Sequence, residues 1–97
     1  MADTNYGCLC SVRHQAKKTS DLINAICAKF GNSITWSLTG YHFIERPSKY
    51  VIYFRRHGNK FADWVKFLSY DIDVLREIKQ SFPNDFKGDV ETKQGEL

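Results

Sequence analysis

The feature that most constrains the fold is one amphipathic helix with strand-like segments on both sides of it. Five apolar residues recur at the spacing of a single helical face: Leu22, Ile23, Ile26, Cys27 and Phe30. This spacing predicts a helix that buries the stripe. Thr19 or Ser20 is expected to cap its N-terminus, and Gly31 to take the left-handed position at its C-terminus.

Strand-like patterns lie before and after this helix. Cys8, Cys10 and Val12 occupy alternate positions in residues 8–13, which predicts a short first strand. Residues 33–45 are rich in β-branched and aromatic residues, and their apolar positions change parity at Gly40, so we predict a strand with a bend or bulge there. The stretch 49–56 is apolar on both faces between residues 50 and 54, which predicts a central strand.

The last third of the chain has weaker patterns. Residues 60–70 match the helix template, although they would also serve as a hairpin partner for 49–56, and the helix is the preferred interpretation. Asp71 is expected to cap a final helix that ends before Pro83. Residues 84–97 are acidic with few apolar side chains, which predicts a partly disordered tail, or one edge strand at 86–91.

Together these elements predict one α+β domain over residues 1–97, with residues 1–5 frayed. We expect a small antiparallel-dominated sheet with two or three helices packed on one face. A ferredoxin-like split βαβ arrangement is the leading topology, and it requires that 86–91 form the fourth strand. A chain of 97 residues is too short for two ordinary domains.

The cysteine count and the N-terminus bear on the compartment. The longest apolar run covers five residues, 50–54, far from the ~20 that cross a bilayer. The first residues lack the cationic and apolar regions of a secretory signal. An odd number of cysteines, three, fits a reducing environment better than a disulfide scaffold. We therefore expect a cytoplasmic protein with no membrane partner.

No pattern of catalytic or metal-binding residues emerges. The P-loop, GxGxxG, HExxH and GxSxG signatures are absent. Cys8, Cys10 and His14 would bring three ligands together, yet the usual C-x2-4-C spacing and a second ligand pair are missing. Asp71 and Asp73 are better explained by helix capping than by metal binding. We expect no enzyme activity, no metal and no cofactor.

Charge is distributed unevenly along the chain. The net charge of +3 combines +6 in residues 1–70 with −3 in residues 71–97. Within 46–66, six Lys and Arg residues accompany a single acid, Asp63, and nine of the fourteen aromatic rings fall in 41–70. Basic groups beside aromatic rings are typical of surfaces that bind anionic partners.

We assign a binding surface to this basic and aromatic part of the chain. Its residues are Arg46, Lys49, Tyr53, Arg55, Arg56, His57, Lys60 and Lys66. The competing interpretation leaves the cations as a solvated rim and places aromatic residues in the core: Phe54, Phe61, Trp64 and one face of Tyr50 and Tyr53.

Two functions follow from such a surface. The first is a small non-enzymatic regulatory or inhibitory protein that occupies an acidic surface of a protein partner, a design that fits a phage or mobile-element accessory protein. The alternative is nucleic-acid binding through phosphate contacts and aromatic stacking on the same surface. An exposed edge strand would also permit a homodimer.

Overall fold

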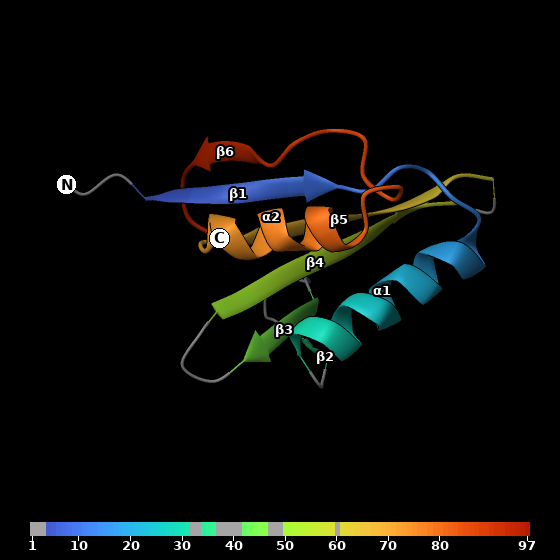
Figure 1. Ribbon diagram of the computed structural model, residues 1–97, viewed down its shortest axis with the longest axis horizontal. Coiled ribbons are helices and arrows are strands. Elements are labelled where there is room, and N and C mark those ends of the chain that lie inside the picture. Colours follow the sequence, from blue (N-terminus) through green and yellow to red (C-terminus); the bar gives the residue numbers. More distant parts are fainter. Residues whose placement is uncertain (1–3, 32–33, 37–41, 47–49, 60) are drawn as a thin grey trace.

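The computed structural model describes residues 4–31, 34–36, 42–46, 50–59 and 61–97, with the backbone alone at 35–36, 42–43 and 45–46 (Figure 1). The described residues form six strands and two helices. In chain order these are β1 (Asn5–Cys10), α1 (Ala16–Phe30), β2 (Ile34–Trp36), β3 (His42–Arg46), β4 (Tyr50–Gly58), β5 (Asp63–Ser69), α2 (Ile72–Ser81) and β6 (Glu91–Gln94). None of the described helices is long and apolar enough to span a membrane.

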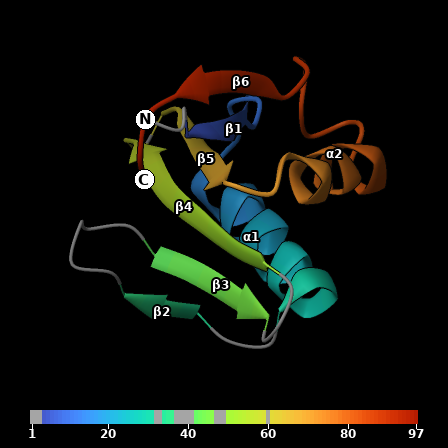
Figure 2. The same cartoon turned by 90° about the vertical axis from the view of Figure 1, so that its left-hand side faces the viewer.

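The strands make one antiparallel sheet in the order β2-β3-β4-β5-β1-β6. Figure 2 shows α1 and α2 on the same side of this curved sheet. Helix α1 contacts β3 and β5, and α2 contacts β1 and β5. The α+β class with an antiparallel sheet and helices on one face is therefore confirmed, with two helices in the described part of the chain. We call the helix-free side of the sheet the open face.

The core lies between the helices and the sheet. The apolar stripe predicted for α1 is buried there in full. It packs against alternate residues of the sheet, among them Ile52 and Phe54 of β4 and Val65 and Phe67 of β5. Phe86 closes the core from the segment after α2, with its ring 6.1 Å from that of Phe67. The period-2 burial of β4 and β5 fixes which of their side chains reach the open face.

The preferred interpretation of residues 60–70 as a helix is wrong. Residues 63–69 form β5, which pairs with β4 on one side and β1 on the other. The spacing of Phe61, Trp64, Val65 and Leu68 fits a helical face, but these residues do not share one side: Val65 faces the helices, and Trp64 and Leu68 lie opposite β4 residues on the open face. The segment forms a strand because two neighbouring strands supply hydrogen-bond partners for its backbone. The spacing of apolar residues alone does not reveal such partners.

The segment predicted as one bent strand over 33–45 contains two strands. Ile34 in β2 lies opposite Ile44 in β3, so the chain reverses direction between them. The change in apolar parity marks this reversal, because a hairpin restarts the alternation on its second strand. Gly40, where the bend was expected, lies outside the described residues.

The ends of α1 also differ from expectation. The helix begins at Ala16, after an N-cap Gln15 whose side chain makes no capping hydrogen bond. Thr19 lies inside the helix, fully buried, and its hydroxyl donates to the Asp63 backbone oxygen at 3.2 Å. Gly31 is extended, with φ of −173°, so it does not take the left-handed conformation. The capping preference of Thr19 was therefore overridden by a tertiary contact.

The C-terminal elements follow the sequence more closely. Asp71 caps α2, accepting hydrogen bonds from the backbone N–H groups of Asp73 and Val74. The edge strand expected at 86–91 lies later, at Glu91–Gln94, where it pairs with β1. Phe86 is buried before that strand begins, so the segment enters the sheet only after its apolar residue has reached the core.

Candidate functional site

Neighbouring residues of β4 point to opposite sides of the sheet, and this separates the cations that are adjacent in sequence. Arg56 faces the helices, where its guanidinium reaches α1. Tyr53, Arg55 and His57 occupy the alternate positions on the open face. Their cross-strand partners in β5 are Leu68, Lys66 and Trp64 respectively. The open face therefore carries rows of side chains that run across the strands.

One row places two cations directly opposite each other. Arg55 in β4 is in register with Lys66 in β5, and Lys66 is in register with Cys10 in β1. Like charges in direct cross-strand register repel each other, which disfavours such a pair in a sheet. Local rules are most often broken in this way at functional sites.

The next row is a stack of planar groups around Trp64. The His57 ring lies parallel to the indole, with centroids 5.5 Å apart and an interplanar angle of 17°. The Arg13 guanidinium carbon lies 5.1 Å from the indole centroid. Because His57 comes from β4 and Arg13 follows β1 on the opposite side of β5, Trp64 stands between them. The stack orients a guanidinium that would otherwise be mobile.

The electrostatic effect of these cations is visible at His57. Burial lowers the pKa of its imidazole, and the positive charges of Arg55 and Lys66 lower it further. The ring is therefore neutral at pH 7, which suits its position flat against an indole. Arg55 and Lys66 thus place positive charge next to the imidazole.

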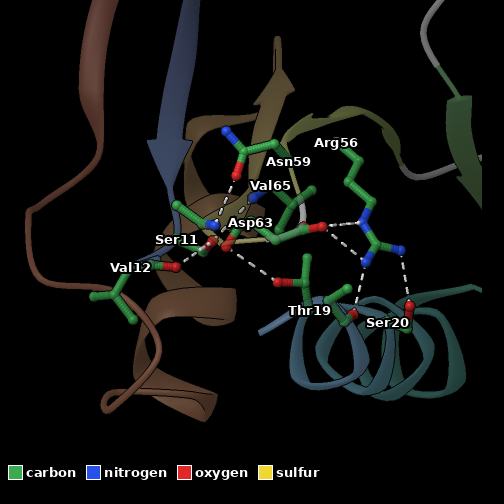
Figure 3. Close-up of polar contacts among 10 residues, drawn as sticks. Ser11, Val12, Thr19, Ser20, Arg56, Asn59, Asp63 and Val65 are labelled. Atoms are coloured by element: carbon green, nitrogen blue, oxygen red, sulfur yellow. Dashed lines mark hydrogen bonds and ion pairs between the residues drawn. The ribbon is translucent and has the colours of Figure 1, made fainter. Parts of the chain in front are cut away.

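On the helix side, Arg56 is part of a polar cluster that ties α1 to the sheet (Figure 3). Its Nε donates to the two Asp63 carboxylate oxygens at 2.9 and 3.1 Å, and its Nη2 donates to Oδ2 at 3.0 Å. The guanidinium also donates to the Ala16 carbonyl oxygen at 2.6 Å and to the Ser20 hydroxyl at 2.8 Å. Asp63, the single acid within 46–66, is thus committed to Arg56 on the side away from the open face.

The β4–β5 turn presents an aromatic ring beside the stack. Gly58 has φ of +123°, and a Cβ there would lie 2.1 Å from the Ala62 oxygen. Asn59 Oδ1 accepts hydrogen bonds from the backbone N–H groups of Phe61 and Ala62 at 2.8 and 3.1 Å. Phe61, whose backbone N–H donates to Asn59, is 82% exposed. A large exposed aromatic ring is typical of a contact residue.

The structure divides the residues that the sequence assigned to the binding surface. Tyr53, Arg55, His57 and Lys66 meet on the open face, whereas Arg56 lies on the helix side. Three further assignments go undescribed: the Arg46 side chain, Lys49 and Lys60 all lie outside the described part of the structure.

The core interpretation of the rings is confirmed for Phe54 and wrong for Phe61 and the half-buried Trp64. Sequence reasoning missed Arg13. The available signal was a cation directly after the first strand.

Metal-binding and nucleophilic groups are sparse. Within the described ranges no three His, Cys, Asp or Glu side chains gather in a way that could hold a metal ion. All three cysteines are free thiols. Burial raises the pKa of Cys27, and burial together with the nearby Cys10 raises that of Cys8, so these two thiols are poor nucleophiles at pH 7.

Comparison of the chain with protein-family models, with curated proteins and with solved structures finds no match. The function is therefore argued from the geometry and charge of the open face.

Proposed function

We propose that this protein is a small non-enzymatic binding protein that holds single-stranded nucleic acid on its open face. The observation that carries the proposal is the pairing of Arg55 with Lys66 in cross-strand register, beside the stack of Arg13, Trp64 and His57. Cations supply contacts to phosphates, and aromatic rings between them supply contacts to bases. A sheet with one face free of helices is a known platform for such strands.

The separation of faces removes the single acid of 46–66 from the open face. Asp63 is only 8% exposed and is bound to Arg56 on the helix side, so the two leave the open face together and its net charge is unchanged. Strand β6 contributes one further cation, Lys93, and one carboxylate, Glu91. The positive charge that remains on the open face favours an anionic partner.

A regulatory or inhibitory protein that occupies an acidic protein site is the second candidate. Phe61 favours it, because an aromatic side chain that is 82% exposed has the character of an interface anchor. Arg55 and Lys66 would then meet carboxylates instead of phosphates. For this second candidate we also propose an origin in phage or mobile elements, an intracellular location and the formation of a homodimer.

We also infer a ferredoxin-like arrangement for the central part of the sheet. Strands β6-β1-β5-β4, with α1 and α2 as the connections, follow the order of a split βαβ fold. Strands β2 and β3 extend it beyond β4 as an added hairpin. This arrangement leaves the central strands β1 and β5 in the middle of the open face.

The test is binding to labelled dT20, rU20 and a 20-base-pair duplex, measured by fluorescence anisotropy at 50 and 200 mM NaCl. Four phosphate contacts would weaken single-strand binding roughly 50-fold between these salt concentrations. Replacing Arg55 or Lys66 with Gln should lower the slope of log K against log salt by about 0.7 each.

Lys18→Gln is the matched control, because it removes the same charge from an exposed position on α1. It should leave both affinity and slope close to those of the native chain. Absence of oligonucleotide binding at 50 mM NaCl, or equal losses in Lys18→Gln and Lys66→Gln, would contradict the nucleic-acid proposal. The acidic-protein candidate would then stand, and Phe61→Ala would be its first variant.

A further inference from the structure

A hollow of about 480 Å³ lies at one end of the open face, between residues 10–14 after β1 and residues 87–88. We propose that this hollow is a binding site for a phosphate group. Arg13 and Lys87 both line it, and Cys10 on its wall is in register with Lys66. The proposal rests on the proposed function only for the source of the phosphate, a nucleic-acid strand that follows the open face.

The Arg13 guanidinium is oriented by an aromatic ring, and its N–H groups are not used within the described part of the chain. It lies over the Trp64 indole at 5.1 Å, which holds its plane. Among the described residues it has no hydrogen-bond acceptor, so its N–H donors are available to a ligand. A planar fork of donors held by stacking loses little freedom when it binds the oxygens of a phosphate.

Lys87 is carried by a segment that is anchored on both sides of it. The Phe86 ring is 2% exposed in the core, and Lys79 Nζ donates to the Phe86 and Gly88 carbonyl oxygens at 3.2 and 2.6 Å. Lys87 itself is exposed and has no acceptor among the described residues. The backbone is thereby fixed while the ammonium group faces solvent at the edge of the hollow.

His14 completes the wall of the hollow. Its backbone exchanges hydrogen bonds with Asp63 at 2.7 and 3.0 Å, and its side chain is 10% exposed. Nε2 lies 3.2 Å from Asp85 Oδ1, but without hydrogen-bond geometry, so this buried nitrogen has no hydrogen-bond partner in the described part of the chain. Asp85 contributes a carboxylate beside His14, whereas the hollow itself is lined by the cations Arg13 and Lys87.

A phosphate group fits this arrangement better than a carboxylate. The three terminal oxygens of inorganic phosphate or of a phosphate monoester can accept from two cations at once, whereas the two oxygens of a carboxylate suit a single guanidinium fork. At neutral pH inorganic phosphate also carries more charge than a carboxylate. The hollow would hold a phosphate group of the strand while the rest of the strand crosses β1, β5 and β4.

Inorganic phosphate is the probe for this site. We would follow backbone amide shifts by NMR while sodium phosphate replaces sodium chloride at constant ionic strength. Saturable shifts are expected at residues 10–14 and 87–88. Arg13→Gln and Lys87→Gln should each weaken binding roughly tenfold, the effect of one charge-assisted hydrogen bond. Lys18→Gln, which removes the same charge from α1, should leave it unchanged.

Alkylation of Cys10 gives an independent measurement. Cys10 is exposed whereas Cys8 and Cys27 are buried, so iodoacetamide should label Cys10 first. Bound phosphate should slow that labelling in the native chain and not in Arg13→Gln. Three results would each overturn the site. They are amide shifts that grow linearly without saturation, equal losses of phosphate affinity in Lys18→Gln and Lys87→Gln, and a rate of Cys10 labelling that phosphate does not change.

The same experiment with dT20, with and without a 5′-phosphate, separates this site from the proposed function. Tighter binding of the phosphorylated strand would show that the hollow holds a terminal phosphate. Equal binding of both strands, with amide shifts at residues 10–14 and 87–88, would show that it holds a backbone phosphate. If inorganic phosphate binds and neither strand does, the site stands and the nucleic-acid function fails. If the strands bind without shifts at residues 87–88, the function stands and the site fails.

Discussion

Replacing Arg56 with Ala tests the separation of the two sheet faces on which the functional argument depends. Arg56 links three partners on the helix side: the Asp63 carboxylate, the Ala16 carbonyl oxygen and the Ser20 hydroxyl. Its removal leaves Asp63, whose side chain is 11% exposed, without its cation. The adjacent Arg55→Ala removes the same kind of side chain from the open face and touches none of these contacts.

The magnitude follows from the exposure of the two partners. Breaking a fully buried ion pair costs several kcal/mol, whereas an exposed pair contributes less than about 1 kcal/mol. With Arg56 36% exposed and Asp63 11% exposed, the pair lies between these limits. We expect Arg56→Ala to lower the free energy of unfolding by about 2 kcal/mol, and the melting temperature by about 10 °C. Arg55→Ala should lower the free energy of unfolding less, because Arg55 lies on the open face and makes none of these contacts to Asp63, Ala16 and Ser20.

The assay is urea unfolding followed by circular dichroism, with Asp63→Asn and the double variant added to complete a thermodynamic cycle. A coupling free energy above about 1 kcal/mol between positions 56 and 63 would assign the loss to their ion pair. Equal destabilisation by Arg55→Ala and Arg56→Ala, or a coupling near zero, would refute the assignment of Arg56 to the helix side.

Three further predictions concern α2 and the open face. Asp71→Ala should destabilise the protein by about 1 kcal/mol in urea unfolding, because the N–H groups of Asp73 and Val74 lose their acceptor; an unchanged midpoint would show that the cap contributes nothing. For His57, Lys66→Gln should raise the pKa measured by NMR titration toward the usual value of histidine, because one of the charges that lower it is gone. The folded pKa of His57 lies below the unfolded one, so its contribution to stability is present above about pH 6.5 and is lost as the pH falls through the folded value. His57→Gln should therefore lose stability less steeply with acid than the native chain, and a steeper loss would contradict this sign.

Much of the fold could be predicted from local patterns. The stripe of Leu22, Ile26 and Phe30, the cap at Asp71 and the central position of β4 each depend on short-range spacing, which a sequence displays directly. The β5 segment could not be predicted in the same way, since Trp64, Val65 and Leu68 fit a helix as well as a strand. Only pairing with β4 and β1 resolved it.

The candidate site could likewise be predicted in part from the sequence, and the rest depended on the fold. The sequence alone determined that cations and rings gather in one stretch of the chain, with Asp63 as the single acid among them. Tertiary structure decided which of them act together: the alternation of β4 sends Arg55 to the open face and Arg56 to α1, and the register brings Lys66 opposite Arg55. Arg13 and Lys87, 74 positions apart by number, border one hollow only because β1 and the segment after α2 lie side by side. Composition and local spacing follow from the order of residues, whereas the facing of a side chain and its distant neighbours depend on strand pairing, which is a property of the folded chain.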